Sequence, residues 1–336
     1  TLEYATATVW FVFYFPWPSV VDPALEELPL RGIFEEFSRF CRPLVLAGWA
    51  GIVYSFADRW LLQRYSGSTE QAYLSIAQQF SAVSLIAAVS FINILWKEAA
   101  AAHHQGDQEL LGRLFLRSVR VLYFIATALT CFAIPFSREV FPRVLGPAYA
   151  NCWPTFAVLA LYPMHQSLGQ ITGAYFQATG RTRAYMVFVL ALVAVSLPLA
   201  YWVLAPSAGA LPGLGLGSKG LAVKMVLVQA LMINLQGLYI CRKAGWRWPL
   251  AYQLTAPAVL LALGAACLAA ASAVVPNTST AWVFAKLAFG FILYACAAGA
   301  LLLRFPEFAG LEPGKIAQWA RLGTDFARSL RGGSAT

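Results

Sequence analysis

The chain has few charged residues for its length of 336. Only 12% of its residues are Asp, Glu, Lys or Arg, whereas 60% are hydrophobic, and the mean hydropathy is +0.64. A soluble domain carries about 25% charged residues and roughly 45–50% apolar ones. This shortage of charge excludes an ordinary soluble domain. It predicts an all-α polytopic membrane protein, because the apolar runs are continuous and do not alternate as in barrel strands.

Histidine is also scarce, and the cysteines are not paired. The sequence contains three histidines and six scattered cysteines, with no CxxC pair and no histidine at ligand spacing. We therefore expect no metal site and no cofactor. The six cysteines are interpreted as small apolar packing residues: Cys41, Cys131, Cys152, Cys241, Cys267 and Cys296.

Nine stretches are long and apolar enough to cross a bilayer, which requires about 20 mostly apolar residues. They are residues 4–21, 43–62, 71–96, 114–136, 154–179, 184–206, 220–240, 250–275 and 282–303. The chain begins at Thr1 without an initiator Met, and its first span lacks the basic region and cleavage site of a signal peptide. We expect a fragment that lacks its N-terminal part.

Lys and Arg concentrate on one side of these spans. Fifteen lie in the connections after the odd-numbered spans and in the C-terminal tail, and four lie in the even-numbered connections. Because positively charged loops stay in the cytoplasm, the C-terminus is predicted to be cytoplasmic. The net charge of +9 then reflects topology, and no nucleic-acid partner is expected. Residues 313–331 fit an amphipathic helix on the membrane surface, with a frayed tail as the alternative.

The loops offer little room for chemistry. The longest connection is 22–42, so a soluble catalytic domain does not fit, and the predicted outer loops hold only two acids, Glu70 and Glu139. The glycines of "GLGSKG" match a nucleotide-binding pattern in letters alone, since no strand precedes them. We read them as an irregular turn into a span. The chain is expected not to be an enzyme.

Ionisable residues inside the spans form two tiers. Lys97, Arg113, Arg117 and Arg120 lie near the predicted cytoplasmic face, and Asp58, Arg59, Lys224 and Lys286 lie about one turn from the outer helix ends. Each costs roughly 2.5–3.5 kcal/mol to insert, so each calls for a partner or a function. A simpler explanation needs no function. The positive-inside rule accounts for the cytoplasmic tier, and side chains of the outer tier can reach the lipid headgroups.

Asp58 and Arg59 are adjacent in the sequence, so they do not share a helical face and are not expected to pair with each other. We hypothesise that Asp58 pairs with Lys224 of a neighbouring helix as an outer gate, while Arg59 faces a cavity or the headgroups. The alternative for Asp58 is an ordinary interfacial helix end.

Neutral polar residues form stripes between the two tiers. They include Asn93 in the third span, Gln166 and Gln170 in the fifth and Gln229 in the seventh. Such residues can simply hold helices together, but several stripes together favour a hydrated cavity. Carboxylates are missing from the middle of the spans, which gives ion coupling little support. A cavity with cations at both ends and neutral hydrogen-bonding groups between them suits an anionic, hydroxyl-rich cargo.

Two regions are similar to a known family. Residues 37–107, with "ADRWLLQRYSG", "AYLSIAQQF" and "KEAAAAHHQGD", resemble polysaccharide flippases of the multidrug/oligosaccharidyl-lipid/polysaccharide exporter superfamily. So do residues 144–185, which enter a span through Gly146–Tyr149 and leave it through Ala178–Arg181. The resemblance covers roughly residues 25–245, and its motifs are loose.

The resemblance implies two six-helix lobes that work by alternating access. On that template, residues 1–21 are the last helix of the N-terminal lobe, and 22–42 are the linker between lobes. Residues 43–245 form the six-helix C-terminal lobe, 246–304 an extra helix pair and 305–336 a cytoplasmic amphipathic tail.

The function that it implies is the flipping of an undecaprenyl-pyrophosphate-linked oligosaccharide, an O-antigen or exopolysaccharide unit, across a bacterial inner membrane. The expected partners are this cargo, membrane lipids and polysaccharide polymerase machinery. Arg59, Asn93, Lys97, Arg113, Arg117, Arg120, Gln166, Gln170, Lys224 and Gln229 would bind the cargo. The alternatives are a multidrug exporter of the same fold, distinguished by intramembrane carboxylates, and a membrane glycosyltransferase or ligase.

Overall fold

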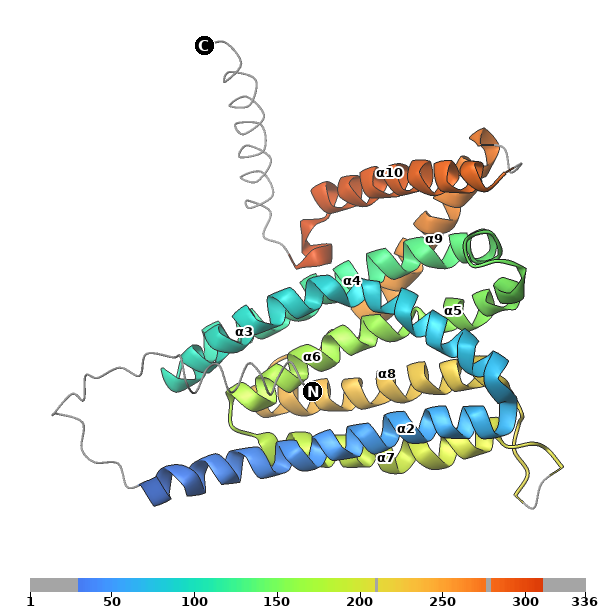
Figure 1. Cartoon of the computed structure of the whole chain (residues 1–336). Coiled ribbons are helices and arrows are strands. Elements are labelled where there is room, and N and C mark those ends of the chain that lie inside the picture. The colour runs from blue at the N-terminus through green and yellow to red at the C-terminus, as the bar shows by residue number, and fades with distance from the viewer. Residues whose placement is uncertain (1–29, 209–210, 276–278, 311–336) are drawn as a thin grey trace, which may run out of the picture. The chain divides into compact units, whose positions relative to one another are not determined.

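The computed structural model describes residues 30–208, 211–275 and 279–310, and every regular element in these ranges is a helix (Figure 1). The chain divides into two compact units between Arg42 and Pro43, within helix α2. The predicted span 4–21 and the amphipathic helix 313–331 lie outside the described residues, as do positions 22–29 of the predicted linker.

From residue 43 onward, the described helices cover most of each predicted span, with breaks in two of the spans. They are α2 (Leu30–Ala82), α3 (Ile86–His104), α4 (Gln108–Val144), α5 (Trp153–Leu159), α6 (Tyr162–Ala178), α7 (Thr182–Leu204), α8 (Gly217–Ala244), α9 (Leu250–Val274) and α10 (Thr280–Arg304), with short 3-10 turns η1 (Val83–Leu85), η2 (Pro147–Cys152) and η3 (Pro306–Ala309). Six of the described helical segments are long and apolar enough to cross a membrane, by length and composition. The all-α membrane class is confirmed.

A single glycine separates the second predicted span from the third. Gly67 has φ 82° and ψ −178° within α2, and a residue with a Cβ rarely adopts a positive φ of this kind. The helix therefore has two limbs, one ending before Gly67 and one running from there to Ala82. The η1 turn then bends the chain before α3, so the predicted span 71–96 is not one straight helix.

The predicted span 154–179 is wrong as one continuous helix. It is interrupted at Ala160 and Leu161, between α5 and α6. Pro163 in the first turn of α6 has no N–H, and its ring would clash with the carbonyl of Leu159 in a continuous helix. The hydroxyl of Thr130 on α4 donates a 2.9 Å hydrogen bond to the carbonyl of Ala160, which satisfies a backbone group at the break.

Helix α4 lies at the centre of the second unit. It packs against α3, α5, α6, α9 and α10, and α8 packs against α5, α6 and α7 (Figure 1). One buried cluster joins α4, α6 and α8 and includes Tyr123, Leu168 and Ile240. A second joins α2, α5 and α8 and includes Leu74 and Phe156. These two cores fix the helices that line the cavities described below.

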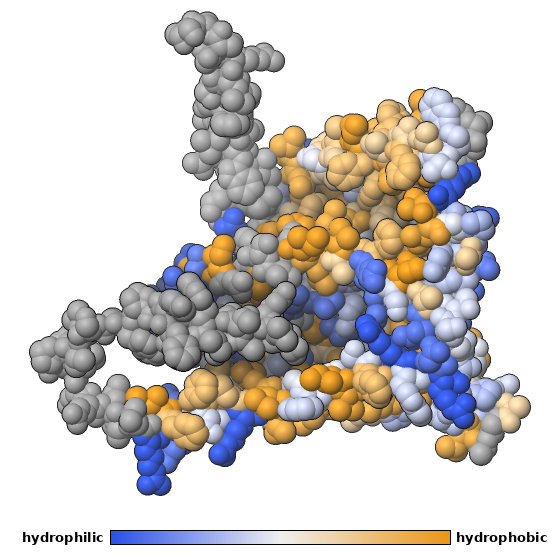
Figure 2. Space-filling view, viewed as in Figure 1, coloured by the Kyte–Doolittle hydropathy of each residue, from blue (hydrophilic) through white to orange (hydrophobic). Residues whose placement is uncertain are grey.

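The outer surface is apolar. Large hydrophobic side chains are exposed along the helices, for example Phe56 at 69% and Leu254 at 77%. Figure 2 shows hydrophobic residues over the outside of α10, where Phe291 and Ile292 are exposed. A soluble monomer rarely shows apolar patches of such extent, so this surface suits lipid.

Glycine brings the last two helices close to α4. A Cβ at Gly264 of α9 would lie 2.4 Å from the carbonyl oxygen of Cys131, and one at Gly290 of α10 would lie 2.5 Å from the ring of Phe136. Small residues allow close helix approach where lipid gives little hydrophobic drive for association. A partly buried ion pair adds to this contact, because Lys286 Nζ lies 2.9 Å from Glu139 Oε2. The sequence placed Lys286 in the outer tier without this partner.

Candidate functional site

A cavity rich in glutamine lies among α2, α3, α6, α7 and α8. Its volume is about 750 Å3. The amide side chains that line it are Gln166, Gln170 and Gln177 from α6 and Gln229 and Gln236 from α8, and the aromatic ones are Tyr54, Trp96, Tyr162 and Tyr185. We call it the glutamine cavity. It gives the apolar bundle an uncharged interior surface with many donors and acceptors.

Helix periodicity and one glycine explain how the amides meet. Residues four and eleven positions apart lie on one helical face, so Gln166, Gln170 and Gln177 all point from the same side of α6. Gly169 lies on that side too, and a Cβ there would lie 2.9 Å from Ile233 Cδ1 and 3.3 Å from Gln229 Nε2. The missing side chain lets α8 bring Gln229 against α6.

The amides differ in how far they are satisfied. Gln236 Oε1 accepts a 2.7 Å hydrogen bond from Thr172 Oγ1 and is held in place. Gln170 Oε1 is buried and has no hydrogen-bond partner among the described residues. A buried carbonyl without a partner costs about 1–3 kcal/mol, so this oxygen has an unused capacity to accept a hydrogen bond.

A second cavity of about 340 Å3 shares Tyr54, Tyr162 and Gln166 with the first. We call it the ion-pair cavity, because Asp58 lines it and pairs with Lys224 of α8. Lys224 Nζ donates to both carboxylate oxygens, at 2.7 Å and 2.8 Å. The two side chains are only 5% and 2% exposed, and Nζ also lies 4.9 Å from the centroid of the Tyr54 ring.

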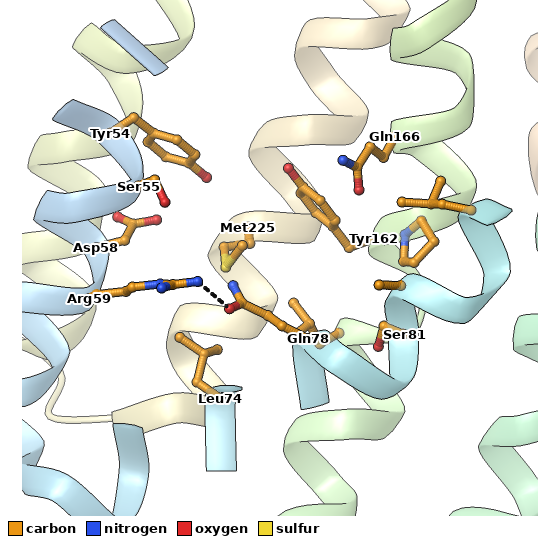
Figure 3. A pocket seen from close by; sticks show the side chains of 14 residues that line it. Tyr54, Ser55, Asp58, Arg59, Leu74, Gln78, Ser81, Tyr162, Gln166 and Met225 are labelled. Carbon is orange, nitrogen blue, oxygen red and sulfur yellow. Dashed lines mark hydrogen bonds between the residues drawn. The ribbon is translucent and has the colours of Figure 1, made fainter. Parts of the chain in front are cut away.

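Arg59 crosses the ion-pair cavity between the two limbs of α2. Its Nη2 donates a 3.3 Å hydrogen bond to Gln78 Oε1 (Figure 3). Figure 3 also shows Tyr54 and Asp58 on the first limb and Tyr162 on α6, around the same space. Of the described residues that line the two cavities, Asp58 is the only carboxylate and Arg59 the only cation. Because Lys224 neutralises Asp58, Arg59 is the one unbalanced charge among the described lining residues.

Six of the predicted residues meet at these cavities, and Asp58 is one of them. Arg59, Gln166, Gln170 and Gln229 line them, and Lys224 forms the predicted contact with Asp58. Asp58 is buried and lies about two turns before Gly67, so its carboxylate meets Lys224 in the protein interior. That the pair acts as a gate stays a prediction. The side chain of Asn93 lies outside the described residues.

The four predicted cytoplasmic-tier cations are not among the residues that line the cavities. Lys97 is exposed on α3. Arg113 forms an exposed pair with Glu109, four residues earlier, with 3.4 Å between Nη1 and Oε1. A cargo role for these residues therefore stays a prediction, without geometric support here.

The packing of α4 explains where Arg117 and Arg120 lie. A Cβ at Gly310 would be 2.8 Å from Arg120 Cβ and 3.5 Å from the carbonyl oxygen of Arg117, and Tyr252 of α9 donates to the carbonyl of Arg120. This side of α4 therefore meets α9 and the residue that follows the η3 turn. Periodicity correctly put both arginines on one face but did not reveal which neighbour that face meets.

Sequence reasoning missed several lining residues. Gln78 lies within "AYLSIAQQF", and only the packing distinguishes it from the exposed Gln79. Tyr54 and Tyr162 gave no signal, because aromatic residues are common throughout the spans. The two acids considered for an enzyme have structural contacts: Glu139 pairs with Lys286, and Glu70 accepts hydrogen bonds from the backbone N–H and hydroxyl of Ser218 at the start of α8.

The sequence itself matches no protein-family model and no curated protein. The fold, however, is shared with solved transporters. One is described as an outward-facing conformation of a multidrug resistance MATE family transporter of the MOP superfamily, at a TM-score of 0.59 and 15% identity. Another is a MOP superfamily transporter from Pyrococcus furiosus whose binding pocket is described as having reverse polarity, at 0.59 and 16%.

A third structure, a point mutant of a MATE protein, matches at a TM-score of 0.58 and 16% identity. In all three, the match covers 73% of this chain and 54% of the other. The chain therefore spans about half the length of these transporters and has the fold of that part. At such low identity, the likeness describes fold alone.

Proposed function

We propose that this chain is part of a transporter of the MOP superfamily that moves an organic cargo across a membrane through the glutamine cavity. The observation that carries the proposal is a 750 Å3 space lined by five glutamines inside an otherwise apolar helical bundle. Burying so many amides is costly unless they bind one another, water or a cargo. The shared fold with MATE transporters supports the same conclusion.

The cavity suits alternating access if its contacts with the cargo change between states. A cargo shifts a conformational equilibrium only by the difference in its affinity for the two states. Gln170 Oε1 offers such a contact, because it has no partner among the described residues in this state. Gln236 is already bonded to Thr172 and contributes less to a change.

A small organic molecule is the cargo class that the structural neighbours favour. One of them is described as a multidrug resistance transporter. The volume of about 750 Å3 lies within the range of roughly 300–1,000 Å3 typical of small-molecule sites. The aromatic side chains of Tyr54, Trp96, Tyr162 and Tyr185 would pack against an apolar ring system.

A lipid-linked oligosaccharide is the second candidate, and a specific observation favours it. The one lining carboxylate is neutralised by Lys224, whereas Arg59 has no ion-pair partner among the described residues. This field disfavours a cation and attracts a phosphate, and amides match sugar hydroxyls. On this proposal, the C-terminus faces the cytoplasm of a bacterial inner membrane, and polysaccharide polymerase machinery receives the cargo.

Transport by the full-length protein in proteoliposomes would test both candidates. Q170L and Q229L remove one cavity amide each, and we expect them to slow transport on the order of tenfold, the effect of losing a buried hydrogen bond. Q79L is the matched control, because Gln79 is exposed and outside both cavities.

The cargo arms of that experiment are a cationic dye and an undecaprenyl-pyrophosphate oligosaccharide. Transport of the dye alone would assign the exporter function, and transport of the lipid alone would assign the flippase function. If Q170L and Q229L move either cargo as fast as Q79L does, the glutamine cavity is not the pathway.

A further inference from the structure

A third cavity lies outside the proposed cargo pathway, on the hairpin of α7 and α8. Its volume is about 440 Å3, and its lining residues are Phe188, Leu235, Leu238, Tyr239, Arg242 and Lys243. Helices α7 and α8 follow each other in the chain and pack together (Figure 1). The second turn of α7 therefore lies beside the last turns of α8, and the rings of Phe188 and Tyr239 are 5.6 Å apart.

The two cations mark one end of this groove. Arg242 and Lys243 are exposed and lie in the last turn of α8. Among the described residues, neither has an ion-pair partner, and no carboxylate lines the groove. Lys243 Nζ lies 5.9 Å from the centroid of the Tyr239 ring, a cation–π contact that holds the ammonium at the mouth of the groove.

The other end of the groove continues as an apolar stripe. Leu227, Leu231 and Leu235 are 63%, 53% and 43% exposed, and their spacing of four residues places them along one face of α8. From Leu227 to Arg242 the helix rises about 22 Å. One leaflet of the hydrocarbon core is about 15 Å deep, so the stripe is long enough to follow an acyl chain.

We propose that this groove binds an anionic phospholipid of the surrounding membrane. Arg242 and Lys243 contact its phosphate, Phe188 and Tyr239 flank the glycerol region, and an acyl chain lies along Leu235, Leu231 and Leu227. The charge decides the occupant, because two unpaired cations beside an apolar groove complement a phosphate joined to a hydrocarbon chain. Basic pockets between membrane helices bind such headgroups. The alternative is that the cations only complement the helix dipole, which favours positive charge at the C-terminal end of α8. The dipole does not explain why an apolar groove leads to these cations.

The site is distinct from the cargo cavities. None of its six lining residues lines the glutamine cavity or the ion-pair cavity. It nevertheless lies on α8, the helix that carries Gln229 and Lys224. A lipid bound there would hold α7 against α8, so it would stabilise the state in which these two helices form the groove.

Native mass spectrometry of the full-length protein would test the site. The probe is the anionic lipid dioleoylphosphatidylglycerol, and the control lipid is dioleoylphosphatidylcholine, which has the same acyl chains but no net charge. We expect tighter binding of the anionic lipid. In R242Q/K243Q the affinity should fall on the order of 30-fold, from about 1 kcal/mol per cation near the surface. R242K/K243R should retain most of it. R247Q is the matched control, because Arg247 is exposed in the connection between α8 and α9 and does not line the groove.

Equal binding of the anionic lipid by the parent protein and R242Q/K243Q would overturn the proposal. So would full competition by inorganic phosphate at the same concentration, since the site would then recognise free phosphate without the apolar groove. An unchanged thermal unfolding temperature of R242Q/K243Q in the absence of added lipid shows that the variant is folded. If the unfolding temperature of R242Q/K243Q is lowered, lipid binding is compared between R242K/K243R and R247Q, which both keep two cations at the groove. An equal loss of lipid binding in these two variants would also overturn the proposal.

Discussion

Lys224 of α8 and Asp58 of α2 form a buried ion pair in which one ammonium donates to both carboxylate oxygens. The two residues are 166 positions apart in the sequence, and their contact joins α2 to α8. Two charges so far from water are tolerated only together, because each alone would be an uncompensated buried ion. The contact therefore holds the first limb of α2 against α8 in this structure, and its role as a gate stays a prediction.

The pair can be tested by a double-mutant cycle. D58N and K224Q should each destabilise the protein by about 3–5 kcal/mol, since each leaves the other charge buried without a partner. The double variant should be more stable than the sum of the single losses implies. Unfolding in detergent and transport in proteoliposomes are the two measurements. Strictly additive losses would show that the two residues act independently and are not a gate.

Variants of Arg59 and Arg120 distinguish two places where an anionic cargo would bind. Arg59 lines the ion-pair cavity, and Arg120 is exposed on the outer face of α4. R59A should slow transport of a phosphate-bearing cargo about tenfold, because it removes the lining cation. R120A should have a smaller effect, since Arg120 lies against Gly310 after the η3 turn and lines neither cavity. The initial transport rates of the two variants provide the comparison. A larger loss in R120A or R117A would restore the role that the sequence predicted for the arginine face.

The contact of α9 with α4 depends on the absence of a side chain at Gly264. G264A would bring a Cβ to 2.4 Å from the backbone of Cys131, and such overpacking costs about 1–3 kcal/mol. G299A on α10 is the control, because no atom lies within 4 Å of the position of its Cβ. Stability against a denaturing detergent should fall in G264A alone. Equal stability of the two variants would mean that α9 moves freely on α4.

The topology can be tested with cysteine accessibility. S68C should react with an impermeant thiol reagent added to intact cells, and Q105C should not, because the distribution of Lys and Arg places them on opposite sides. Both positions are exposed at helix ends. The native Cys41 and Cys296, which are not buried, are first replaced by serine. Labelling of Q105C without labelling of S68C would invert the predicted orientation.

Apolar runs were enough to predict the helices, because a segment in lipid must satisfy its backbone internally. The break at Ala160 was not evident, since Pro163 is compatible with either the first turn of a helix or a kink. The pairing of Asp58 with Lys224 followed from the cost of burying lone charges. The position of Arg120 depended on which helix packs against α4, and a single sequence carries no record of such long-range contacts.

The turn between α5 and α6 also changes helical phase. In an uninterrupted helix, the direction of Gln166 would be fixed by Trp153, at 100° for every intervening residue. Ala160 and Leu161 keep helical dihedrals, but the N–H of Leu161 bonds to the carbonyl of Val158, three residues earlier. A 3-10 step turns by about 120° per residue instead of 100°, so this short turn rotates the glutamine side of α6 relative to α5. Loss of one residue between Gln166 and Gln170 would rotate part of that side away from the glutamine cavity.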